Sequence, residues 1–148
     1  MYCVRADIES FFGVVPVGKW ADLDGDADAT KIAARIAAAI EWAGNEIDAT
    51  LRGGPYAVPF TTPYPHHIHD LCVKLAGTHM YSARGAEDTD ADGEAMDRYA
   101  PIRNKCEKRL AAILSGQLDL GITTTARTVP LVRRVALEDH DITATTLP

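Results

Sequence analysis

The sequence predicts a mainly α-helical protein, a small antiparallel bundle of about four helices followed by an extended C-terminal arm. Apolar residues recur every three or four positions in four separate stretches, which is the spacing of one helix face. Glycine and proline residues separate these stretches. After Gly121 the chain becomes rich in β-branched residues, which divides the 148 residues into a helical body, residues 1–121, and an arm, residues 122–148.

The first two predicted helices differ in length. A short helix is indicated by the helical spacing of Val4, Ile8 and Phe11 before a stop at Gly13. A much longer helix ends at Gly53 and follows an Asp-rich segment, in which Asp26 or Asp28 can cap its free N–H groups. Its apolar stripe consists of Ile32, Ile36, Ile40, Ala43, Ile47 and Leu51.

The other two predicted helices lie on either side of an acidic linker. Residues 55–65 contain four prolines and are expected to form an ordered loop, with a third helix starting near Pro65 and ending at Gly85. Its apolar face carries Ile68, Leu71, Cys72, Leu75 and His79. A fourth helix ends at Gly116, and Pro101 is expected to kink its first turns. Its stripe consists of Tyr99, Ile102, Cys106, Leu110 and Ile113.

Composition excludes several classes of protein. The 15 Lys and Arg residues are outnumbered by 21 Asp and Glu residues, and a net charge of −6 disfavours a general nucleic-acid binder. No stretch approaches the ~20 apolar residues of a membrane span, and the N-terminus lacks the order of a signal peptide, so we expect a cytoplasmic chain with reduced thiols. Cys3, Cys72 and Cys106 form no zinc-binding spacing. We interpret Cys72 and Cys106 as buried small hydrophobic residues.

The acidic linker is a candidate calcium site. Asp88, Asp90 and Asp92 alternate and precede Gly93, which reproduces the first half of a calcium-binding loop. The bidentate Glu required at the twelfth position is replaced by Tyr99. A solvated, helix-capping linker is therefore the preferred interpretation.

Two other polar clusters are weaker metal candidates. The alternating Asp residues 22, 24 and 26 place Ala27 where a calcium loop needs glycine. His66 can share a helix face with His69 or Asp70, but two or three ligands with no partner elsewhere do not make a site. We expect neither a metal nor another cofactor. No nucleophile elbow, phosphate loop or paired zinc motif occurs in the sequence, so we do not expect an enzyme.

Two stretches of the body resemble a known family. Residues 46–76 combine the end of the long helix, a Tyr-x-x-Pro loop that begins at Tyr56, and the third helix. Residues 98–121 combine the last helix with a Gly-x-x-x-Leu-Gly exit that ends at Gly121. In this order the elements resemble the small helical neck proteins of Mu-like prophages, long filed as a family of unknown function. That family is similar to the head-to-tail adaptors, or connectors, of tailed phages.

The resemblance implies a structural protein of the virion neck, made in the cytoplasm of the bacterial host. Such adaptors form a homo-oligomeric ring, here implied to be twelve-fold, between the portal protein and the next stopper or tail protein. DNA passes through the lumen of the ring without specific binding. The resemblance transfers no catalytic residue. Two alternatives stay open, namely a tail-completion or stopper protein, and a metal- or calcium-binding helical module.

The arm is the predicted portal-binding segment. An isolated strand buries too little apolar surface to offset its ordering entropy, so we expect it to order on a partner. Alternate apolar side chains would then set the register, and arginines would pair with an acidic portal surface. Residues 122–137 contain three arginines and no acidic residue. The predicted binding residues are Arg127, Val129, Leu131, Val132, Arg133, Arg134, Val135 and Leu137.

Overall fold

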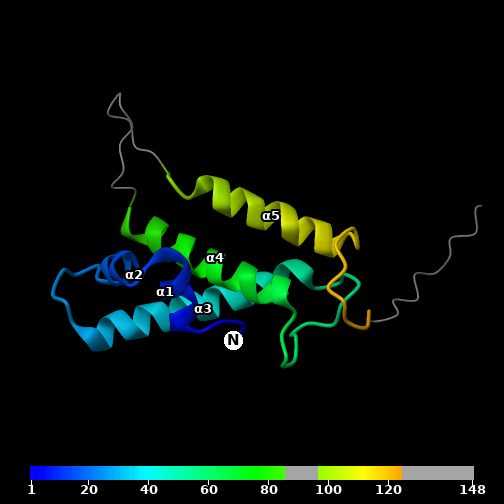
Figure 1. Cartoon of the computed structure of the whole chain (residues 1–148), viewed down its shortest axis with the longest axis horizontal. Coiled ribbons are helices and arrows are strands. Elements are labelled where there is room, and N and C mark those ends of the chain that lie inside the picture. The colour runs from blue at the N-terminus through cyan, green and yellow to red at the C-terminus, as the bar shows by residue number, and fades with distance from the viewer. Residues whose placement is uncertain (86–96, 125–148) are drawn as a thin grey trace, which may run out of the picture.

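A computed structural model describes residues 1–85 and 97–124, and these residues form five helices and no strand. The mainly α-helical fold class is confirmed (Figure 1). Most of the predicted arm lies outside the described residues. The helices are α1 (Arg5–Phe12), α2 (Val14–Ala21), α3 (Ala29–Leu51), α4 (His66–Arg84) and α5 (Ala100–Leu114).

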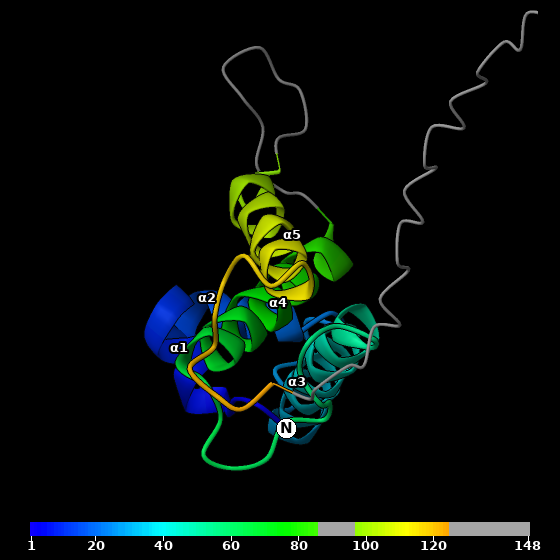
Figure 2. The same ribbon diagram turned by 90° about the vertical axis from the view of Figure 1, so that its right-hand side faces the viewer.

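Helix α4 is the centre of the bundle. It contacts each of the other four helices, and Ile68, Leu71 and Cys72 on it are completely buried. Helices α3 and α5 both run antiparallel to α4, while α1 and α2 pack against another side of it (Figures 1 and 2). Because apolar residues surround α4 on several sides, its buried surface is wider than the single stripe predicted from spacing.

Helix α3 follows its predicted pattern closely. Its buried residues include Ile36, Ile40, Ile47 and Leu51, which all belong to the predicted stripe. The carboxylate of Asp28 accepts hydrogen bonds from the backbone N–H groups of residues 30 and 31, at 2.8 and 3.3 Å. These bonds satisfy two of the donors that every helix leaves free at its N-terminus.

Helix α2 was not predicted from the sequence. Gly13, with a φ of 96°, ends α1 as expected, but a second helix begins at the next residue. Its residues VVPVGKWA include β-branched residues, Pro16 and Gly18, all of which have low helix propensity. Tertiary packing compensates, because α2 buries Val17 and Trp20 against the bundle.

Helix α5 begins at Ala100, with Pro101 in its first turn. The N–H groups of a first turn have no partner within the helix, so a proline there removes no helical hydrogen bond. A proline at this position gives no reason to expect a kink, and Pro101 instead marks the start of the helix. None of the helices in residues 1–85 and 97–124 is both long and apolar enough to cross a membrane.

Aromatic side chains join α1, α2 and α4 to the start of α5. The ring of Trp20 makes edge-to-face contacts with Phe12, Tyr81 and Tyr99, with centroids 5.3 to 5.6 Å apart. Phe12 also covers Gly77 of α4, where a side chain would have no room. Such pairs stabilise a core beyond the area they bury. Trp20 is thus a core anchor, while Trp42 is 39% exposed.

Candidate interaction site at the base of the C-terminal segment

Tyr56 joins the proline-rich loop, residues 55–65, to the segment that follows α5. Its hydroxyl accepts a hydrogen bond from the backbone N–H of Leu120 and donates one to Oδ1 of Asp119, both at 3.0 Å. The same Oδ1 atom accepts a hydrogen bond from the N–H of Gly121 at 2.9 Å. The Gly121 N–H, followed by the Tyr56 hydroxyl, holds the pKa of Asp119 below its usual range. The carboxylate therefore stays ionised and keeps both bonds.

The exit from α5 explains why these residues meet. The N–H groups of Gln117 and Leu118 both donate to the carbonyl of Ala112, at 2.9 and 3.0 Å, so the chain folds back over the end of the helix. Gly116 has a φ of 74°, which residues with a side chain rarely adopt. The Tyr-x-x-Pro loop and the Gly-x-x-x-Leu-Gly exit, identified separately in the sequence, are thus directly bonded to one another.

A groove of about 400 Å³ lies beside this junction. Residues 57, 59–63 and 65 of the loop form one side, and Ile122 and Thr123 complete it. The C-terminal segment therefore leaves the body at the edge of a mostly apolar groove. We call the Tyr56 contacts and this groove the arm base.

A second tyrosine holds the same loop from the N-terminal side. The Tyr2 hydroxyl accepts a hydrogen bond from the backbone N–H of Phe60 at 2.9 Å and donates one to the carboxylate of Asp48 in α3. Its ring makes edge-to-face contacts with Phe60 and Tyr64. Burial, and then the Asp48 carboxylate, raises the pKa of Tyr2 well above its usual value. Tyr2 therefore remains a neutral donor, and the loop is held at two points.

The predicted portal-binding residues lie outside the described residues, because all of them fall between 127 and 137. The candidate calcium ligands Asp88, Asp90 and Asp92 also lie outside, within residues 86–96. The structure therefore leaves both predictions as they stand.

The candidate ligands His66 and His69 do lie in the described part. The Nε2 atom of His69 is 3.0 Å from Oδ2 of Asp7 in α1, whereas the His66 ring has its centroid 6.2 Å from that of His67. No three His, Cys, Asp or Glu side chains of residues 1–85 and 97–124 gather in a way that could hold a metal. The structure thus gives His69 a different partner, a carboxylate that ties α4 to α1.

Two of the alternating Asp residues before α3, Asp24 and Asp26, are paired with cations. Asp24 accepts a hydrogen bond from Arg35 at 2.8 Å and lies 3.4 Å from the Lys31 ammonium. Asp26 pairs with the same Lys31. These ion pairs join the segment before α3 to the first turns of that helix.

Helices α4 and α5 are joined by an ion-pair network. The carboxylate of Asp70 lies 2.6 Å from Nζ of Lys74 in its own helix and 2.6 Å from Nη1 of Arg109 in α5. Burial raises the pKa of Asp70, but the two cations outweigh burial and hold this pKa below its usual range. Lys74 also lies over the ring of Phe11, 5.2 Å from its centroid.

An exposed apolar corner was missed by sequence reasoning. Phe11, Val14 and Val15 lie within five positions at the junction of α1 and α2 and are 48%, 63% and 69% exposed. We call these three residues the α1–α2 corner. The sequence signal was present, because an apolar run that is interrupted by Gly13 cannot all face one core. Clustered exposed apolar side chains are typical of protein contact sites.

Comparison with known proteins places this chain in a family. No curated protein and no solved structure gives a significant match to the chain. The family described as Bacteriophage Mu, Gp36 matches residues 2–138, which include all five helices, the arm base and much of the segment beyond it. The chain therefore belongs to the bacteriophage Mu Gp36 family, and it is a phage protein.

Proposed function

We propose that this protein is a head-to-tail adaptor of a tailed phage, prophage or phage-like particle. In this proposal, copies of the chain form a ring in the virion neck, between the portal and the next stopper or tail protein. The protein acts by binding and not by catalysis. Family membership supports the phage part of the proposal.

The arm base is the structural observation on which the proposed adaptor role rests. A docking arm needs a fixed attachment point on the body, since a fixed attachment raises the local concentration of the arm at its partner. Tyr56 supplies this point by bonding the chain at Asp119 and Leu120, just before the three arginines of residues 122–137. Repetition of a modest contact around a ring would make the joint tight without a large interface in each subunit.

Two further features fit assembly in a ring. The α1–α2 corner offers exposed apolar side chains for contact between copies of the chain. The net charge of −6 would let DNA pass along an acidic lumen without adhering to it. The lumen idea is tested by reversing Asp and Glu charges on one helix face at a time. DNA packaging and ejection unchanged for every face would contradict it.

The central test is removal of residues 125–148, which leaves a chain ending at Thr124. The truncated protein should keep its helical circular dichroism, since the five helices and the Tyr56 contacts all lie before residue 125. It should lose most of its affinity for purified portal protein. Unchanged affinity would show that the arm does not grip the portal.

Charge variants test whether the arginines of the arm pair with the portal or whether any change in the arm's charge weakens binding. Replacing Arg127, Arg133 and Arg134 with alanine should weaken portal binding by about tenfold or more, most clearly at low salt. The matched control neutralises the three acidic residues that follow, Glu138, Asp139 and Asp141, as Gln or Asn. Equal loss of affinity in both triple variants would contradict pairing between these arginines and the portal.

Binding measurements distinguish two other possible functions from the adaptor role. A tail-completion or stopper protein would bind the tail-side partner but not the isolated portal. A calcium- or metal-binding module would show saturable heat in calorimetry with calcium or zinc, which the acidic linker at residues 88–92 motivates. An adaptor should bind portal and give no such heat.

A further inference from the structure

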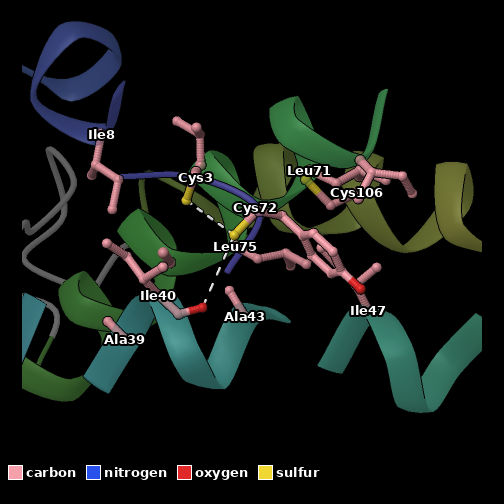
Figure 3. Packing of buried hydrophobic residues seen from close by; sticks show 14 of the residues in the cluster. Cys3, Ile8, Ala39, Ile40, Ala43, Ile47, Leu71, Cys72, Leu75 and Cys106 are labelled. Atoms are coloured by element: carbon pink, nitrogen blue, oxygen red, sulfur yellow. Dashed lines mark hydrogen bonds between the residues drawn. The ribbon is translucent and has the colours of Figure 1, made fainter. Parts of the chain in front are cut away.

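Two cysteines that are far apart in the sequence lie in direct contact. The Sγ atom of Cys3 is 3.0 Å from the Sγ atom of Cys72, and Figure 3 shows the two sulfurs facing one another in the core. Cys3 lies in the segment before α1, and Cys72 lies in α4. Both residues are buried, with exposed fractions of 4% and 0%. A disulfide bond would require the two sulfur atoms to approach by about 1 Å more.

Both sides of this contact are held in place. Next to Cys3, Tyr2 is bonded to Asp48 and to Phe60, and the N–H of Val4 donates to Asp7 at 2.8 Å. Cys72 lies in the helix that contacts all the others. The two thiols therefore face each other because of the surrounding fold, rather than through the free motion of a chain end.

The pKa values of the two thiols are shifted in opposite directions. The Cys3 thiol donates a hydrogen bond to the Cys72 sulfur. That bond, followed by backbone hydrogen bonds, outweighs burial and lowers the pKa of Cys72 from the usual thiol value. The same contact, together with burial, raises the pKa of Cys3. The thiolate is the nucleophile in thiol oxidation, so this direction favours Cys72 as the attacking sulfur.

We propose that Cys3 and Cys72 are an oxidative modification site, at which a peroxide converts the two thiols into an intramolecular disulfide. A small neutral oxidant suits this pair, because exposed fractions of 0% and 4% mean that the sulfurs are reached only through brief local opening of the fold. This proposal rests on the contact between the sulfurs and is independent of the adaptor role.

The chemistry balances with hydrogen peroxide as the oxidant. The Cys72 sulfur attacks one peroxide oxygen and the O–O bond breaks, which gives the sulfenic acid of Cys72 and one water. The Cys3 sulfur then attacks the Cys72 sulfur, the S–O bond breaks, and the second water leaves. Two sulfurs each lose one electron, the peroxide gains two, and both thiol protons end in water. A thiol reductant reverses the change.

The disulfide would tie the N-terminal segment to α4. Phage components are made where thiols are kept reduced, and a particle released from the cell meets oxidising surroundings. The bond would close a loop of about 70 residues and thereby restrict the unfolded chain. It would also fix the segment that carries Tyr2, and through Tyr2 the proline-rich loop. As a component of the released particle, which is part of the proposed function, the protein would thus gain stability after release.

The test uses the full chain, treated with hydrogen peroxide and then denatured in an alkylating agent. Free thiols should fall from three to one per chain, a peptide containing residues 3 and 72 should appear, and dithiothreitol should restore all three thiols. The Tm of the oxidised protein should exceed that of the reduced protein by roughly 5–15 °C. Oxidation of Met1, which is 69% exposed, serves as an internal measure of the peroxide dose.

Cys106 provides a matched control, because it is equally buried but has its pKa raised, first by burial. The variant Cys106→Ser should lose both remaining thiols and keep the full rise in Tm. The variant Cys3→Ser should give no linked peptide and no rise in Tm, because the sulfenic acid of Cys72 then has no thiol to attack it. This variant decides the question if Cys72→Ser does not fold. Three thiols remaining after complete oxidation of Met1, or sulfinic acid without a linked peptide, would overturn the proposal.

Discussion

The ring of Phe12 lies directly against the backbone of Gly77, so that a methyl group added at Gly77 would come within 2.1 Å of the Phe12 Cε2 atom. This contact brings the end of α1 onto the middle of α4. Because the ring of Phe12 also packs against Trp20 and Tyr99, it cannot move aside without disturbing the aromatic cluster. The close approach makes Gly77 a structural requirement of the fold.

We predict that Gly77→Ala lowers the free energy of unfolding by about 1–3 kcal/mol, since overpacking forces side chains from their preferred rotamers. The matched control is Gly18→Ala in α2, where nothing lies within 4 Å of an added Cβ atom. That change should raise stability by about 0.5–1 kcal/mol, because alanine favours the helix. Urea unfolding measures both values. A Gly77→Ala protein as stable as the wild type would contradict the packing described here.

Removal of the Tyr56 hydroxyl tests the arm base. Tyr56→Phe leaves the N–H of buried Leu120 without its acceptor, which costs about 1–3 kcal/mol for local opening of this segment. Hydrogen exchange at the Leu120 amide should become faster, while the helices keep their protection. Tyr64→Phe is the control, since the Tyr64 ring packs on Tyr2 at the other end of the loop. Unchanged exchange at Leu120 in Tyr56→Phe would show that the Tyr56 hydroxyl does not fix the start of the C-terminal segment.

Asp70→Asn should reduce stability in a pH-dependent way. The pKa of Asp70 is depressed in the folded protein, so its contribution is fully present above the pKa of about 3.9 of an unfolded Asp and is lost as the pH falls through the lower folded value. At pH 7 the variant should be less stable by roughly 1 kcal/mol, because this network is partly exposed to solvent. The difference from wild type should shrink as the pH falls below 4.

The control for this experiment is Glu107→Gln on the exposed side of α5, which should leave stability unchanged at pH 7. Thermal unfolding between pH 3 and pH 7 provides the measurement. A loss of stability in Asp70→Asn that is the same at pH 3 and pH 7 would mean that the ion pairs with Lys74 and Arg109 are not its source.

The α1–α2 corner offers a test of self-assembly. Val15→Glu places a charge on a side chain that is already 69% exposed, so the monomer should fold normally. If this corner contacts a neighbouring copy, the charge should prevent ring formation, measured by light scattering and electron microscopy with portal present. Leu23→Glu is the control, at a side chain that is 48% exposed elsewhere on the surface. Rings of normal size and yield from Val15→Glu would exclude the corner from the contact between subunits.

The sequence predicted the helices whose packing follows a regular stripe. Spacing identified α3, because its buried residues recur every three or four positions, and Gly13, Pro65 and Gly85 marked helix ends through backbone chemistry. Helix α2 escaped prediction because its residues have low helix propensity and its stability comes from contacts made only in the folded bundle.

The site was only partly accessible from the sequence, for a similar reason. Both halves of the arm base were recognised as motifs, yet the bond between Tyr56 and Leu120 joins positions 64 residues apart. Cys3 and Cys72 are separated by 69 residues, and no local pattern shows that the fold brings their sulfurs together. Such contacts are products of topology, which local spacing does not encode.

The loop at residues 55–65 is gripped by Tyr2 from one end of the chain and bonded through Tyr56 to the segment that leads out of the body. A pull on that segment would therefore act on α5 through the backbone and also, through the loop, on Asp48 in the long α3 helix. Force would be shared between two helices instead of acting on the last helix alone. The hydrogen bonds of Tyr56 and Tyr2 thus connect the start of the C-terminal segment to α3 as well as to α5.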